Sequence, residues 1–170
     1  FQARCLPQHT LVCLTRDALA TWSDERLCIA AVNGVGALTG TAAPVLLSVT
    51  LCGPSDRAEA WMVSHLYSRK LKPQHPWHHP AYRGMVSDAL ESLPAGCTSV
   101  VSDTTMLSVA GAVRSVDAGY WREWLTTPVD FLGALERAAA VSLANSSCYT
   151  IETGAHDALT PTTTATLAAN

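Results

Sequence analysis

The chain has 170 residues, of which 48% are hydrophobic and 15% charged, and this composition excludes a disordered protein and allows one domain with a buried core. Its net charge of −3, with both signs spread along the chain, provides neither a basic face for nucleic acid nor a polybasic run for anionic lipid. No run of about 18 uncharged apolar residues occurs, so we expect no transmembrane segment.

Strands dominate the expected elements of the N-terminal third. Apolar runs at 11–14 and 27–32 predict two strands, with a short helix over 17–22 between them. Residues 45–52 alternate in hydrophobicity and predict a third strand that buries one face. The glycine-rich residues 34–40 lie between two strands, which favours a hairpin turn over a dinucleotide-binding loop, because no helix follows at which a pyrophosphate could bind.

Two amphipathic helices are expected in the middle of the chain. Asp56 and Glu59 have the spacing of a capping box, and an apolar stripe continues from there to Arg69. A second stripe runs over 85–93. The two helices are separated by the segment QHPWHHPAYR at 74–83, which carries three histidines.

The C-terminal part alternates again between strands and helices. We expect strands at 98–102 and 148–152, and a helix that Asp117 caps. The pair Thr127-Pro128 predicts the start of a longer helix that ends near Asn145, because proline is favoured at the first helical position. Residues 103–116 fit either a helix or a hairpin.

These elements predict an α/β or α+β fold with a mixed β-sheet packed by amphipathic helices. We expect a single domain over residues 1–159 and a Thr/Ala-rich tail over 160–170. The tail lacks large apolar side chains, so we expect it to be an extended arm or disordered.

Cys52 and Arg57 form a candidate catalytic pair. The segment Cys-Gly-Pro-Ser-Asp-Arg lies between a predicted strand and a helix N-terminus, where backbone N–H groups and an arginine can stabilise a thiolate. The loop resembles the cysteine–arginine loop of phosphatases and rhodaneses, although it has four intervening residues where those have five. Asp56 within the loop would repel a thiolate, which favours a buried structural cysteine instead.

The histidines of the 74–83 segment are candidate metal ligands. His75, His78 and His79 could bind copper, nickel or zinc. The three prolines around them favour extended backbone, which separates neighbouring side chains. The segment therefore also fits a stiff linker, or a docking loop for a partner.

Aromatic side chains at two places are candidate contacts with another protein, because tyrosine and tryptophan dominate interface energetics. Together with two of the loop histidines, they make up the predicted partner-binding set: Trp77, His78, His79, Tyr82, Tyr120, Trp121 and Trp124.

On these grounds we expect a non-catalytic structural or accessory subunit that contacts other protein subunits in a larger assembly and binds neither a cofactor nor nucleic acid. A small thiol-dependent hydrolase or transferase using Cys52 is the alternative, and a metal-binding module is the third hypothesis.

The six cysteines contain no C-x-x-C pair and lie mostly among aliphatic residues, which predicts reduced thiols in an intracellular, reducing compartment. The chain begins at Phe1, so we expect a processed or trimmed product, such as a mitochondrial protein after removal of a targeting peptide.

Overall fold

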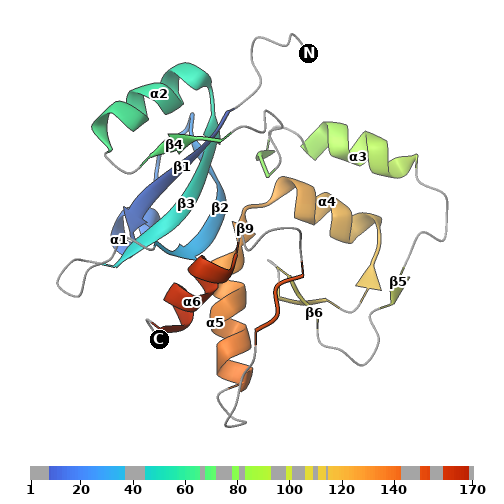
Figure 1. The fold of residues 1–170 in the computed structure, drawn as a ribbon. Coiled ribbons are helices and arrows are strands. Elements are labelled where there is room, and N and C mark those ends of the chain that lie inside the picture. Colours follow the sequence, from blue (N-terminus) through green and yellow to red (C-terminus); the bar gives the residue numbers. More distant parts are fainter. Residues whose placement is uncertain are drawn as a thin grey trace.

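The computed structural model describes residues 8–36, 45–65, 68–71, 78–80, 83–92, 99–100, 106–108, 111–113, 115–142, 150–153 and 159–168. Its central element is a mixed sheet with the strand order β4-β1-β3-β2-β9 (Figure 1). Its strands are β1 Gln8–Thr15, β2 Cys28–Val35, β3 Leu46–Gly53, β4 Arg69–Lys70 and β9 Val129–Asp130. The neighbouring pairs are antiparallel except β2 and β9, which are parallel. The predicted mixed sheet of an α/β fold is thus confirmed.

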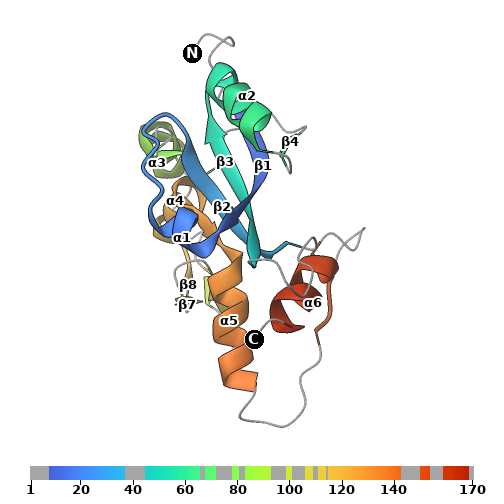
Figure 2. The same cartoon turned by 90° about the vertical axis from the view of Figure 1, so that its left-hand side faces the viewer.

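Six helices accompany the sheet in the part of the chain that the structure describes. They are α1 Arg16–Ala20, α2 Ser55–Ser64, α3 Arg83–Glu91, α4 Ala118–Thr126, α5 Phe131–Ser142 and α6 Thr160–Ala168. Helices α5 and α6 both contact β2, and they approach it from different sides (Figure 2). Helices α3 and α4 pack against each other beside the sheet (Figure 1).

Two short antiparallel ladders complete the described fold. One joins β5 Ser99–Val100 to β8 Ser115–Val116, and the other joins β6 Met106–Ser108 to β7 Gly111–Val113. The second ladder supports the hairpin alternative for this region, because residues 106–108 pair antiparallel with residues 111–113.

The main hydrophobic cluster packs on one face of the sheet. Leu47, Val49 and Leu51 are at most 1% exposed, as their alternation along β3 predicts. Their counterparts on β1, including Val12 at 0%, and residues from α2 and α5 complete the same cluster. Val45 departs from the prediction, because it precedes the strand and is exposed.

The helix expected from Asp56 to Arg69 is shorter than predicted. Helix α2 begins at Ser55, so Asp56 lies inside its first turn and does not cap it, and the helix ends at Ser64 before Arg69 enters β4. Of the strand predicted at 148–152, the described residues 150–152 are not in a strand.

Two further expected elements are wrong. The helix predicted to begin at Pro128 begins at Phe131, because Val129–Asp130 pairs with Ala31–Val32 as strand β9 first. Residues 160–168 are not an extended arm but helix α6, which begins where Glu152 accepts hydrogen bonds from the backbone N–H groups of Leu159 and Thr160.

None of the helices in the described ranges is long and apolar enough to cross a membrane.

Candidate active site around His78

His78 is held by the end of helix α4, although the two are far apart in sequence. Its backbone N–H donates to the carbonyl oxygen of Leu125 at 2.8 Å. Its ring nitrogen Nδ1 lies 3.1 Å from the carbonyl oxygen of Thr127. The last carbonyl groups of a helix have no partner within the helix, so they are available to fix a residue of another segment.

The hydrogen bond to Thr127 determines which ring nitrogen carries the proton. A carbonyl oxygen can only accept, so Nδ1 must be the donor. In the neutral ring the lone pair then belongs to Nε2. This is the tautomer that a histidine needs to take a proton from a nucleophile.

Two further features distinguish His78, one of its ring and one of its backbone. Its centroid lies 5.4 Å from that of Trp124, with the planes at 80° in an edge-to-face arrangement. The backbone of His78 has φ 66°, and no other non-glycine residue in the described part of the chain has a positive φ. Such strained positions occur preferentially at functional sites, because the surrounding structure must hold them in place.

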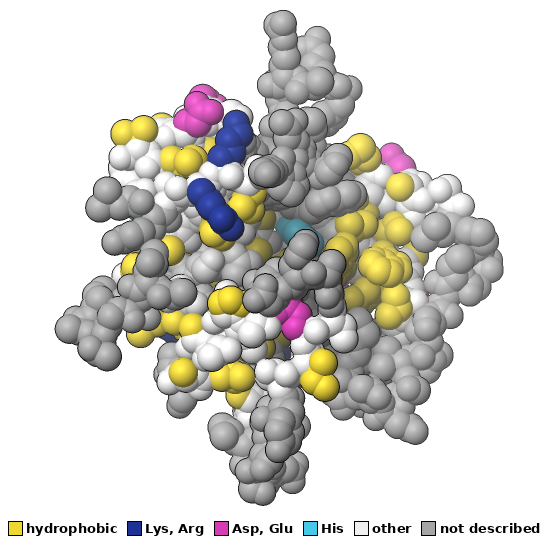
Figure 3. Space-filling view, in the orientation of Figure 1, with side chains coloured by type: hydrophobic (Ala, Val, Ile, Leu, Met, Phe, Trp, Pro, Cys, Tyr) yellow, Lys and Arg dark blue, Asp and Glu magenta, His cyan; other side chains and the backbone are white. Residues whose placement is uncertain are grey.

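The site lies where the α3–α4 pair meets the sheet. Arg122 on α4 donates through Nε to Ser87 on α3 at 3.0 Å, which ties these two helices together. Figure 3 shows a histidine side chain near the centre of this face, beside apolar side chains that gather over α3 and α4. On these two helices, Met85 of α3 is 53% exposed and Trp121 of α4 is 39% exposed.

The structure does not support Cys52 as a nucleophile. Its side chain is fully buried. A hydrogen bond with the thiol of Cys28 and burial both raise the pKa of Cys52, so it stays protonated at neutral pH. Arg57 is no anion ligand either, because its guanidinium binds Asp24 with N–O distances of 2.7 and 3.0 Å.

The predicted metal site cannot be built from the described residues, which contain no cluster of three or more possible ligands. His75, Trp77 and Tyr82 lie outside the described residues. His78 uses Nδ1 for Thr127, and His79 is half-buried.

The aromatic residues of α4 form a cluster among themselves. Trp121 lies edge-to-face with both Tyr120 and Trp124, at centroid distances of 5.2 and 5.7 Å. Tyr120 and Trp124 are half-buried. Partner binding by these side chains stays a prediction.

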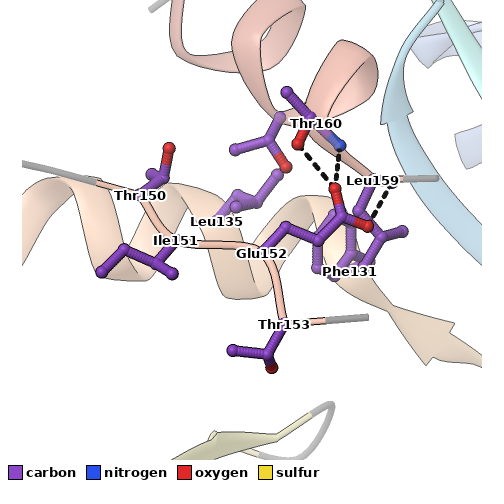
Figure 4. Close-up of a pocket in the computed structure, with 9 residues that line it drawn as sticks. Phe131, Leu135, Thr150, Ile151, Glu152, Thr153, Leu159 and Thr160 are labelled. Carbon is purple, nitrogen blue, oxygen red and sulfur yellow. Dashed lines mark hydrogen bonds between the residues drawn. The ribbon is translucent and has the colours of Figure 1, made fainter. Parts of the chain in front are cut away.

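A separate hollow of about 400 Å³ lies between α5, α6 and residues 150–153 (Figure 4). The charged side chain that lines it is that of Glu152, whose carboxylate points to the start of α6. This carboxylate accepts from the N–H groups of Leu159 and Thr160 and from the Thr160 hydroxyl, at 2.9, 2.8 and 2.6 Å. These bonds cap α6.

Known proteins resemble this chain in structure, but none was found that resembles it in sequence. The sequence matches no family model and no curated protein. The fold resembles the acyltransferase domain of the second module of the salinomycin polyketide synthase, with a TM-score of 0.70 and 24% identity over 94% of this chain and 36% of that one. It also resembles the malonyl CoA-acyl carrier protein transacylase of Burkholderia pseudomallei, with a TM-score of 0.69 and 19% identity over 99% of this chain and 58% of that one. For the acyltransferase domain of PpsC from Mycobacterium tuberculosis the TM-score is 0.67 and the identity 19%, over 96% and 49% of the two chains.

These likenesses establish a shared fold, and the chain spans 36%, 58% and 49% of the lengths of these three structures. They contradict the prediction of a non-catalytic structural or accessory subunit, because the shared architecture is that of acyl-transferring enzymes. Sequence reasoning placed His78 in a docking loop. The tautomer-fixing contact was missed because its acceptor is a backbone carbonyl, which any residue at position 127 would supply.

Proposed function

We propose that this chain carries the general base of an acyltransferase and that His78 is this base. One observation carries the proposal: in a fold shared with transacylases, the carbonyl oxygen of Thr127 holds Nδ1 of His78 in the tautomer that general base catalysis needs. The substrate class comes from the same structures, whose names include malonyl-CoA and acyl carrier protein.

The proposed reaction moves an acyl group between two thioesters. Nε2 of His78 takes the proton of a nucleophilic hydroxyl or thiol, which attacks the thioester carbonyl and forms a covalent acyl-enzyme as the coenzyme A thiol leaves. The imidazolium returns its proton to the departing thiolate. The thiol of the carrier then attacks the acyl-enzyme by the same proton transfers in reverse order, and the nucleophile is regenerated.

The end of helix α4 serves two purposes in this scheme. Its carbonyl groups orient the ring, as the aspartate does in a Ser-His-Asp triad. The negative end of the helix dipole also stabilises the imidazolium that forms during each proton transfer, by an amount on the order of 0.3–2 kcal/mol.

The nucleophile is not assigned within the sequence of 170 residues, which has no G-x-S-x-G elbow. The proposal therefore places it in another part of the acyltransferase fold, of which this chain spans 36–58% in the three structures compared above.

An acyl carrier protein is the protein partner that follows from this reaction. The reducing, intracellular compartment that the cysteine pattern indicates also remains part of the proposal, since acyl transfer between thioesters uses free thiols.

The test is transfer of an acyl group from malonyl-CoA to an acyl carrier protein, followed as the mass gain of the carrier, with the full gene product. The variant His78→Asn removes the base while asparagine tolerates the positive φ. We expect kcat/KM to fall by about 100-fold or more. The matched control is His65→Asn, because His65 stacks on Trp61 of α2, with centroids 3.3 Å apart, and has no role in the mechanism.

The proposal is wrong if the wild-type gene product transfers no acyl group from malonyl-CoA or other acyl-CoA thioesters. It is equally wrong if His78→Asn, folded as judged by circular dichroism, transfers the acyl group as fast as His65→Asn.

A further inference from the structure

Two cysteines lie directly opposite each other in the central sheet. Cys28 is the first residue of β2, Cys52 is near the end of β3, and the antiparallel register pairs the two positions. Directly opposed residues in an antiparallel ladder have Cα atoms about 4.5–5.5 Å apart and side chains on the same face. This spacing falls within the roughly 4.4–6.8 Å that a disulfide spans.

Both cysteines are free thiols in this structure, and they contact each other. The Sγ of Cys28 donates to the carbonyl oxygen of Cys52 at 3.4 Å. Cys52 is fully buried, whereas Cys28 is only half-buried, so a small reagent can approach the pair from Cys28.

The pair is chemically asymmetric. A hydrogen bond from the Cys52 thiol lowers the pKa of Cys28, and the same contact, together with burial, raises the pKa of Cys52. The thiolate therefore forms on the more accessible sulfur, and the buried sulfur keeps its proton. This is the order in which a reactive thiol and a resolving thiol act.

We propose that Cys28 and Cys52 form an oxidation site, a cross-strand dithiol that peroxides convert to a disulfide. The Cys28 thiolate attacks one oxygen of hydrogen peroxide, the O–O bond breaks, and hydroxide leaves, which takes up a proton to become water. The Cys28 sulfenic acid that forms is attacked by the sulfur of Cys52, the S–O bond breaks, and a second water leaves with the Cys52 proton. Two thiols lose two electrons and two protons, and one peroxide becomes two waters.

The sheet also explains why we expect a disulfide between Cys28 and Cys52 and none at Cys13. Cys13 on β1, the other described cysteine, lies opposite Ser48 of β3 and has no sulfur across the ladder. The register of β2 against β3 shifts between Ile29 and Ala31, next to Cys28. Such an irregularity lets the end of β2 adjust to the S–S bond more easily than a continuous ladder would.

The sequence provides a sharp test. Trypsin cuts after Arg26 and Arg57. The resulting peptide 27–57 contains both cysteines and no third cysteine, and it has no lysine or arginine before Arg57. The folded protein is treated with hydrogen peroxide, denatured, alkylated with iodoacetamide and digested. We expect peptide 27–57 to lose two hydrogen atoms and to carry no alkyl group, and dithiothreitol before alkylation should restore two alkyl groups.

Two variants make the result specific. In Cys28→Ser, the same treatment should leave Cys52 unpaired, so that peptide 27–57 carries one alkyl group. In Cys13→Ser, which keeps the pair, peptide 27–57 should oxidise as in the wild type.

Three results would overturn the proposal. The first is a wild-type peptide 27–57 that remains doubly alkylated after peroxide. The second is oxidation of Cys28 to sulfinic or sulfonic acid with no disulfide. The third is disulfide formation that is no faster in the folded protein than in urea, since the folded register would then contribute nothing.

Discussion

Replacing Asp24 with asparagine should destabilise the protein by about 1.5–3 kcal/mol at neutral pH, the usual value for hydrogen bonds to a charged group. Oδ1 of Asp24 accepts from the backbone N–H groups of Arg26 and Leu27 at 2.9 and 3.1 Å. Oδ2 accepts from Nε and Nη2 of Arg57 at 3.0 and 2.7 Å. The side chain is only 14% exposed, so water cannot replace these partners easily. Asparagine keeps one oxygen acceptor but turns an uncharged group toward Arg57.

The effect should depend on pH, and its sign follows from the pKa of Asp24. Burial raises this pKa, but the hydrogen bonds from Arg26, Arg57 and Leu27 together outweigh burial and hold it below its usual value. A carboxyl group with a lowered pKa in the folded state stabilises the protein above its unfolded pKa of about 3.9, and the stabilisation is lost as the pH falls through the folded pKa. The difference between wild type and variant should therefore be full at neutral pH and shrink below about pH 4.

Urea unfolding followed by circular dichroism, at neutral and at acid pH, measures this difference. The matched control is Asp56→Asn, since Asp56 also pairs with an arginine, Arg26 at 3.1 Å, but is 71% exposed. An exposed pair contributes about 0–1 kcal/mol. Equal losses in the two variants, or a loss in Asp24→Asn that stays the same at acid pH, would refute the reasoning.

Two further substitutions test close contacts of the sheet. Thr166→Val should lower the free energy of unfolding in urea by about 1–3 kcal/mol, because the fully buried Thr166 hydroxyl accepts from the backbone N–H of Val35 at 3.0 Å. The control Thr164→Val, at an exposed position of the same helix, should change it by less than about 0.5 kcal/mol. Equal losses in the two variants would contradict the role of Thr166. Gly53→Ala should lower the thermal midpoint, with a loss of about 1–3 kcal/mol, because a Cβ there would press on the carbonyl oxygen of Arg26. The control is Gly84→Ala, where a Cβ meets nothing within 4 Å, and this variant should be as stable as the wild type or more stable. If Gly53→Ala is as stable as Gly84→Ala, the backbone around Gly53 moves aside without cost and the prediction is wrong.

The elements that could be predicted from the sequence are those that depend on local pattern. Alternation along 45–51 predicted which face of β3 is buried, because a strand with one face on the core needs that period. Asp117 was predicted to cap a helix, and its carboxylate accepts from the backbone N–H of Tyr120 at 2.8 Å.

The elements that failed depend on contacts between distant segments. Pro128 is a good first residue of a helix, but the pairing of Val129–Asp130 with β2 delays the helix by three residues. The tail forms α6 because Glu152 caps its first turn and Thr166 bonds to β2, and neither contact has a local sequence pattern. Threonine-rich sequence has low helix propensity, so tertiary contacts decide the outcome here.

The same distinction explains the two candidate catalytic sites. The sequence offered Cys52 and Arg57 as a candidate pair while favouring a buried structural cysteine, and Cys52 is indeed fully buried. It assigned His78 to a linker, a docking loop or a metal site. The Cys52–Arg57 loop has the local features of an anion site, a cysteine after a strand and an arginine at a helix start. However, Asp24, which is 33 residues away, occupies the arginine, and Cys28, which is 24 residues away, adjoins the cysteine. His78 lacked any recognisable motif, yet a carbonyl oxygen 49 residues away fixes its tautomer. In each case the deciding partner is distant in the sequence. A residue's chemistry in this fold is therefore set by which strand or helix end lies beside it, and a motif search along the chain cannot see that neighbour.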